Sequence, residues 1–145
     1  MAPLKLRRDI SLLGFLQKRV LGMSHPSFAS LFPFAPWRTG SVYAGGRPAR
    51  PRHNKQLRNH HATIMNSEQL WRRSVFSMVF TYNRLPQDVV DLEDVSEFQT
   101  ALTNHAKSLL QAGVPDWELE YDSCKNCLRE GRYSDDYRNY PNYPT

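Results

Sequence analysis

Cysteine and long apolar runs are scarce in this chain, and each scarcity excludes a class of protein. Cys124 and Cys127 are the only cysteines among 145 residues, so a disulfide framework is excluded and we expect an intracellular location, in the nucleus or cytoplasm. No run of about 18 apolar residues occurs, so we expect no membrane-spanning helix and no membrane partner. The combined fraction of Leu, Ile, Val and Phe in the chain is just above about 20%, the fraction below which charged chains are usually disordered. A small core surrounded by irregular chain is therefore expected.

Acidic residues are nearly absent from the first half of the chain. Asp9 and Glu68 are the only acids in residues 1–85, against 14 Lys and Arg, whereas residues 86–145 hold 12 acids and 5 Lys and Arg. The net charge of +5 is what remains of these opposed halves. A basic half of this kind favours binding to phosphates, and the alternative is neutralisation of one half by the other on solvated faces.

Motifs that support catalysis are missing or lack their usual context. No Ser, Cys or His arrangement suggests a nucleophilic triad, and no glycine-rich phosphate loop is present. Cys124 and Cys127 have the spacing of half a zinc knuckle, but a structural zinc site needs four ligands and no second pair follows. Residues 133–136 spell the Tyr-x-Asp-Asp box of reverse transcriptases without the apolar strands that normally flank it. We therefore expect no enzyme activity, no cofactor and no metal.

A first helix is predicted from about Arg8 to Met23, where apolar residues recur at helical spacing and a glycine lies near the end. Residues 1–44 are also rich in Arg, contain Ser and have a single acid, which is typical of an organellar transit peptide. We favour an ordinary amphipathic helix and leave organellar targeting open. Its apolar stripe consists of Ile10, Leu13, Leu16 and Val20, widened by Leu12 and Phe15.

A short second helix is predicted over residues 26–31, with Pro26 at its first position. Residues 33–58 then contain four prolines, three glycines, six Lys and Arg, and no acid. This composition predicts a long loop or linker that does not pack, and its length favours local disorder.

Two longer helices are predicted in the second half of the chain. The apolar positions from Gln69 to about Tyr82 suit a helix, although β-branched and aromatic residues leave a strand over residues 74–81 as an alternative. Pro86 ends this element and can open a short turn. Asp94 can cap a further helix that runs to Gly113. Its apolar stripe consists of Val95, Phe98, Leu102, Ala106, Leu109 and Leu110.

The expected fold is mainly α: a small helical domain with a long irregular basic loop and a poorly ordered C-terminal tail beyond Trp117. We divide the chain into residues 1–32, an amphipathic helix region; residues 33–66, a basic loop rich in Pro, Gly and Arg; residues 67–112, a helix-turn-helix-like core; and residues 113–145, an acidic, Tyr-rich tail.

The basic loop is the candidate site for nucleic acid. Guanidinium groups pair with phosphates, and the interleaved Trp37 and Tyr43 can stack on unpaired bases. The alternative is a solvated loop without a specific partner. The residues expected to contact RNA or DNA are Arg38, Arg47, Arg50, Arg52, Lys55 and Arg58.

Several short motifs follow one another in order along residues 5–110: Arg7-Arg8, an apolar helix ending near Gly22, the basic loop, Arg73-Ser74-Val75-Phe76, Tyr82-Asn83-Arg84-Leu85-Pro86 and Val95-Ser96-Glu97-Phe98-Gln99. This order resembles the extreme C-terminal region of reverse transcriptases from jockey-like non-LTR retrotransposons. Tyr82 departs from the pattern, since many relatives have Trp there. The family's catalytic carboxylates lie upstream of this region, so the resemblance implies descent from an RNA-directed DNA polymerase without its activity.

Two hypotheses follow from the sequence. The first is a non-catalytic fragment or remnant of a retrotransposon reverse transcriptase, with weak, sequence-independent binding to RNA or DNA through residues 38–61. The alternative is a small helical interaction or assembly protein, whose apolar helix faces at residues 10–20, 75–80 and 95–110 bind a protein partner.

Overall fold

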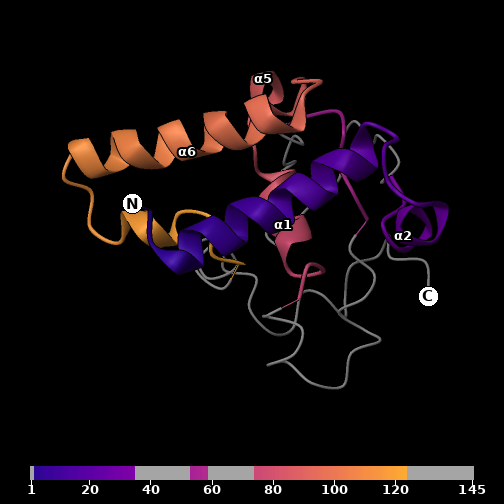
Figure 1. Ribbon diagram of the computed structural model, residues 1–145, viewed down its shortest axis with the longest axis horizontal. Coiled ribbons are helices and arrows are strands. Elements are labelled where there is room, and N and C mark those ends of the chain that lie inside the picture. The colour runs from indigo at the N-terminus through magenta and orange to yellow at the C-terminus, as the bar shows by residue number, and fades with distance from the viewer. Residues whose placement is uncertain (1, 35–52, 59–73, 124–145) are drawn as a thin grey trace, which may run out of the picture.

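The structure, a computed structural model, describes residues 2–34, 53–58 and 74–123. Within these residues the regular elements are the α-helices α1 (Leu4–Val20), α2 (Pro26–Leu31), α4 (Met78–Asn83), α5 (Gln87–Val90) and α6 (Val95–Gln111) and the 3-10 helix η2 (Trp117–Leu119). In Figure 1, α6 lies alongside α1, α5 stands at the start of α6, and α2 lies beyond the C-terminal end of α1. The mainly α fold is confirmed.

Local capping signals fix the ends of these helices. Gly22 follows α1 with φ +75° and Gly113 follows α6 with φ +72°, a left-handed conformation that glycine adopts at little cost. Each glycine closes the same pair of hydrogen bonds back into its helix, one from the glycine N–H and one from the next residue. At the other end of α6, the Asp94 carboxylate accepts hydrogen bonds from the backbone N–H groups of Ser96 and Glu97.

Predicted and observed helices agree for α2 and α6 and differ for α1 and α4. Helix α1 begins at Leu4, before the predicted Arg8, and Pro3 is the residue that precedes its first turn. The helix predicted from Gln69 is wrong over residues 74–77, which form turns whose carbonyls at Val75 and Phe76 accept hydrogen bonds from the N–H groups of Met78 and Val79. Residues 69–73 lie outside the described chain, and the alternative strand over residues 74–81 does not form.

The core lies where α1 meets α4, α6 and η2. Helices α1 and α6 approach closely at Gly14, where an added Cβ would lie 2.4 Å from the Gln99 side-chain nitrogen. A glycine in the middle of a helix costs about 1 kcal/mol relative to alanine, and here it makes room for that side chain. The buried apolar residues are Leu6, Ile10, Leu13, Leu16, Phe32, Leu57, Met78, Val79, Tyr82, Leu85, Val90, Phe98, Leu102, Ala106 and Tyr121.

One fully buried amide connects three elements across this core. The Gln17 side-chain nitrogen on α1 donates to the carbonyl oxygens of Val90 (3.1 Å) and Leu92 (2.8 Å). Its oxygen accepts a 2.7 Å hydrogen bond from the Tyr82 hydroxyl on α4. Because each of these groups is paired, the amide can remain in the core without the cost of an unsatisfied polar group.

Residues 53–58 pack against α4 and α5, so the prediction of an unpacked linker is wrong for this part of residues 33–58. His53 and Leu57 are buried. The Asn83 side chain pairs with both backbone groups of Leu57, its oxygen accepting from the N–H and its nitrogen donating to the carbonyl, each at 2.8 Å. The Gln56 side chain donates to the Asn83 carbonyl oxygen at 2.9 Å. These side-chain amides give an irregular segment the backbone pairing that a helix would otherwise supply.

The chain after α6 also packs, so residues 118–123, the first part of the tail predicted beyond Trp117, lie against the core, and the rest of that tail lies outside the described residues. Tyr121 is buried, and its hydroxyl donates a 2.8 Å hydrogen bond to the Leu102 carbonyl oxygen. The Lys5 ammonium near the start of α1 pairs with Asp122 and lies 3.6 Å from Asp9. These contacts tie the beginning of α1 to the segment that follows α6.

Across the described ranges 2–34, 53–58 and 74–123, every helix is too short or too polar to cross a membrane.

Candidate nucleic-acid interface

The residues predicted to contact nucleic acid divide into two groups. Arg38, Arg47, Arg50 and Arg52 lie outside the described residues. Lys55 and Arg58 belong to the packed segment 53–58, and the structure gives them different surroundings. Only these two can be compared with the sequence expectation.

The ammonium of Lys55 lies against the C-terminal end of α5, where it contacts an acidic residue. It donates a 3.0 Å hydrogen bond to the Val90 carbonyl oxygen and pairs with the Asp91 carboxylate at 3.2 Å. A hydrogen bond from the Gln87 side chain and the contact with Lys55 lower the pKa of Asp91, so its negative charge persists beside the ammonium. Lys55 therefore fastens residues 53–58 to α5, and we do not include it in the interface.

The backbone of Arg58 lies instead beside a segment that carries an exposed aromatic residue, Phe34. The Arg58 backbone N–H donates to the Pro33 carbonyl oxygen at 2.8 Å, and the neighbouring Leu57 forms an isolated antiparallel β-bridge with Phe34. Phe34 carries the Arg19 guanidinium over its ring, 4.6 Å from the ring centroid. The same guanidinium donates a 2.9 Å hydrogen bond to the Phe32 carbonyl oxygen, which holds it in place. The end of the basic loop is thus attached next to a cation and an aromatic ring supplied by other segments.

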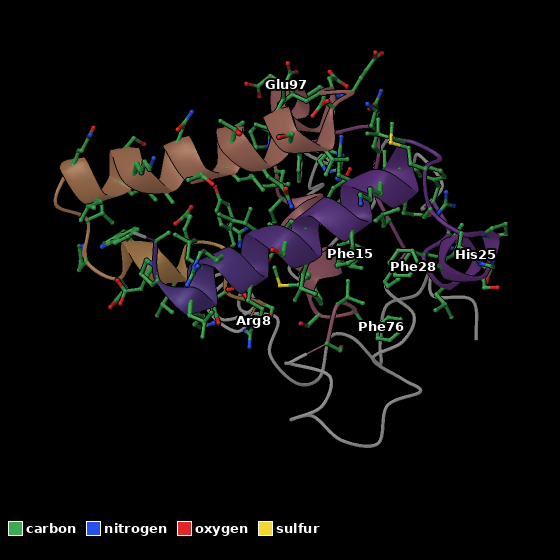
Figure 2. All side chains as sticks on the ribbon, in the orientation of Figure 1. Arg8, Phe15, His25, Phe28, Phe76 and Glu97 are labelled. Atoms are coloured by element: carbon green, nitrogen blue, oxygen red, sulfur yellow. The ribbon has the colours of Figure 1, made fainter. Side chains whose placement is uncertain are left out.

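A second cation and ring, Lys18 and Phe15, both lie on α1. The Lys18 ammonium lies 5.9 Å from the centroid of the Phe15 ring. That ring contacts Phe28 of α2, with 6.4 Å between ring centroids. Figure 2 shows Phe15 and Phe28 between α1 and α2. We call Phe15, Lys18, Arg19, Phe28, Phe34 and Arg58 together the cation–aromatic surface.

Carboxylates are absent from residues 10–67, the stretch of sequence to which every residue of this surface belongs. No Asp or Glu occurs between Ile10 and Ser67. Acidic residues instead gather around α5 and the start of α6, and Figure 2 shows Glu97 on the other side of α1 from Phe15 and Phe28. These acidic residues are therefore separated in space from the cations of the cation–aromatic surface. The surface carries a local positive charge.

His53 holds the segment that carries Arg58. Its Nδ1 accepts a 3.1 Å hydrogen bond from the Lys55 backbone N–H, so its Nε2 carries the proton and donates to the Tyr82 carbonyl oxygen at 2.9 Å. Burial lowers the pKa of His53, and the hydrogen bond to Tyr82 opposes this only in part. The ring therefore acts as a neutral structural bridge.

The structure brings no metal ligands together in residues 2–34, 53–58 and 74–123, where no three His, Cys, Asp or Glu side chains form a group that could hold an ion. Cys124, Cys127 and the Tyr-Ser-Asp-Asp box at residues 133–136 lie outside these ranges.

Comparison with protein-family models, with curated proteins and with solved structures finds no match for this chain. The properties of the cation–aromatic surface therefore have to be inferred from its own residues.

Most of this surface was not foreseen from the sequence. Phe15 was placed on the buried stripe of the first helix, but it is 53% exposed. Lys18 and Arg19 were not expected to contact aromatic rings, and Phe34 fell in the predicted linker. The absence of acids after Asp9 was the one available signal, since it extends through the end of α1 and α2 as well as the loop.

Proposed function

We propose that this chain binds RNA or DNA without sequence preference, through the cation–aromatic surface and the basic loop of residues 38–61 that leads to it. The observation that carries this proposal is the attachment of Arg58 beside Phe34 and Arg19. Lys18 and Arg58 supply positive charge for phosphates, and both belong to the stretch of residues 10–67, which contains no Asp or Glu.

The competing hypothesis of a protein partner on the predicted apolar helix faces is less well supported. The stripes of α1 and α6 are largely used inside the molecule, where Leu13, Leu16, Phe98 and Leu102 pack in one core. A partner could reach them only after the helices separate, which would expose this core to water.

Fluorescence anisotropy with a labelled 20-nucleotide RNA tests the proposal. We expect affinity to fall steeply between about 50 and 200 mM salt, because each neutralised phosphate releases counterions. Arg58→Ala should weaken binding and reduce the slope of log affinity against log salt by about 0.7, the value for one contact to a single strand. Lys107→Ala removes the same charge from an exposed position on α6 and is the matched control. Salt-independent binding, or an equal effect of both substitutions, would contradict the proposal.

We further propose that the chain is a non-catalytic remnant of a retrotransposon reverse transcriptase, on the basis of the ordered motifs in residues 5–110. The genomic sequence upstream of the Met1 codon tests this origin, since an intact or recently broken polymerase reading frame should precede it. A primer-extension assay with Mg²⁺ or Mn²⁺ should show no synthesis, and any synthesis that depends on Asp135 would overturn the assignment.

A further inference from the structure

Two aromatic rings of the cation–aromatic surface are accessible to a ligand. Phe15 is 53% exposed, and Phe34 is 46% exposed even though Arg19 lies over its ring. Burying a Phe side chain releases about 1.5–3 kcal/mol, so two half-exposed rings forgo part of that stabilisation. Scattered apolar side chains on a surface are common, but these two occur together with cations.

Each ring has its own cation, and both cations come from consecutive positions of α1. Lys18 lies over Phe15 and Arg19 lies over Phe34. Phe15 and Arg19 are four residues apart, which places them about 6 Å apart along the helix axis. The Phe15 ring is supported by Phe28, with 6.4 Å between ring centroids, and Phe28 in turn contacts the buried Phe32 at 4.9 Å. A planar group stacked on either ring would thus lie next to a positive charge.

This pairing matches the chemistry of an unpaired nucleotide, which presents a planar base and a phosphate. Proteins that bind single strands combine a positive groove with aromatic side chains on which bases stack. In a duplex the bases stack on one another and only the backbone and groove edges are presented, so exposed rings add little to duplex binding. The absence of carboxylates between Ile10 and Ser67 favours this anionic occupant over an apolar or basic protein surface.

We propose that the cation–aromatic surface selects single-stranded over double-stranded nucleic acid, with bases stacked on Phe15 and Phe34 and phosphates held by Lys18 and Arg58. This inference rests on the proposed function and specifies its ligand. Arg19 keeps its hydrogen bond to the Phe32 carbonyl oxygen and positions the Phe34 ring.

The test compares oligo(U) of 20 nucleotides with an RNA duplex of 20 base pairs, using the full chain at about 50 mM salt. The double variant Phe15→Leu/Phe34→Leu retains apolar side chains but cannot stack. We expect it to lose at least about tenfold in affinity for oligo(U) and to bind the duplex as the wild type does. A second variant, Phe15→Trp/Phe34→Trp, should retain tight oligo(U) binding, and oligo(U) should quench more of its tryptophan fluorescence than it quenches in the wild type, which contains Trp37, Trp71 and Trp117. Circular dichroism checks that both variants fold.

Several outcomes separate this inference from the function on which it rests. If the wild type binds no nucleic acid at all, both the proposed function and the stacking inference are wrong. Salt-dependent binding that Arg58→Ala weakens, combined with an unchanged affinity of the double Leu variant for oligo(U), would overturn the stacking inference alone. Equal wild-type affinity for oligo(U) and duplex would do the same. A dimer detected by light scattering that the double Leu variant abolishes would assign the two rings to a second copy of the chain instead.

Discussion

The hydroxyl of Tyr82 donates a 2.7 Å hydrogen bond to the side-chain oxygen of Gln17, and both side chains are fully buried. Burial also raises the pKa of Tyr82, so the hydroxyl keeps its proton over the range in which the protein is handled. This contact joins α1 to α4 across the core. It is a buried polar contact among the mainly apolar side chains of the core.

Tyr82→Phe should therefore destabilise the fold although it removes a single atom. The Gln17 oxygen would lose its donor in a place that water does not reach, and an unpaired buried polar group costs about 1–3 kcal/mol. Urea unfolding followed by circular dichroism measures the loss. Tyr121→Phe is a useful comparison, because the Leu102 carbonyl that it would release lies within a helix and retains its place in the backbone ladder. A midpoint for Tyr82→Phe equal to that of the wild type would show that the Gln17 oxygen finds another donor.

His53 should make stability fall on acidification. Its pKa is lowered in the folded state, so the unfolded chain takes up a proton first as the pH drops through about 6.5, the ordinary value for histidine. The free energy of unfolding should then decrease down to the lower pKa of the folded state, and His53 should contribute no pH dependence above that window. Urea midpoints between pH 5 and pH 8 for the wild type and His53→Gln provide the measurement. Parallel curves for the two proteins would exclude His53 as the source.

Asp9 should show the opposite dependence. Its side chain is buried, its Oδ2 has no hydrogen-bond partner, and burial raises its pKa against the opposing effect of Lys5. The folded chain therefore holds this proton to higher pH than the unfolded chain, and stability from Asp9 decreases as the pH rises through 3.8 toward the raised value. Asp9→Asn should be more stable at pH 7, because the amide cannot ionise and so avoids the cost of a buried negative charge. A lower urea midpoint for Asp9→Asn at pH 7 would mean that the ion pairs with Lys5 and Arg8 outweigh the burial cost.

Gly14 and Gln99 should be energetically coupled. Alanine at position 14 gains about 1 kcal/mol of helix propensity, but its Cβ would lie 2.4 Å from the Gln99 side-chain nitrogen. We expect the full gain only when Gln99→Ala is also present, and a smaller gain or a loss when Gln99 is retained. A double-mutant cycle of urea midpoints measures the coupling. Equal effects of Gly14→Ala in both backgrounds would show that the Gln99 side chain moves aside without cost.

Local signals in the sequence were sufficient for the elements that depend on neighbouring residues. Pro26 marks the start of α2, and Asp94 with Gly113 marks both ends of α6, because capping is decided within a few residues. The packing of residues 53–58 could not be predicted in this way. It depends on the Asn83 side chain, whose partner Leu57 is 26 residues away, and neither composition nor periodicity pairs an amide with a distant backbone.

In the candidate site, too, one feature could be predicted from local sequence and another depended on distant contacts. Arg58 was identified from the run of positive charge in the loop, which is a property of composition. Phe15 was misplaced because helical periodicity gives its angle on α1 but not which neighbouring element covers that angle. Helix α2 contacts the Phe15 ring through Phe28 and leaves half of it accessible. Only the arrangement of α1 and α2 in space determines this.

The contact between Lys5 and Asp122 spans 117 residues, and this has a consequence for synthesis on the ribosome. Helix α1 emerges well before its partners α6 and residues 117–123, which are the last segments of the described core. The apolar side chains of α1 therefore stay exposed to water until almost the whole described core has been translated; these include Leu6, Ile10 and Leu13. Folding that depends on such distant contacts is slow. The nascent chain is thus an expected client of chaperones that shield apolar helices.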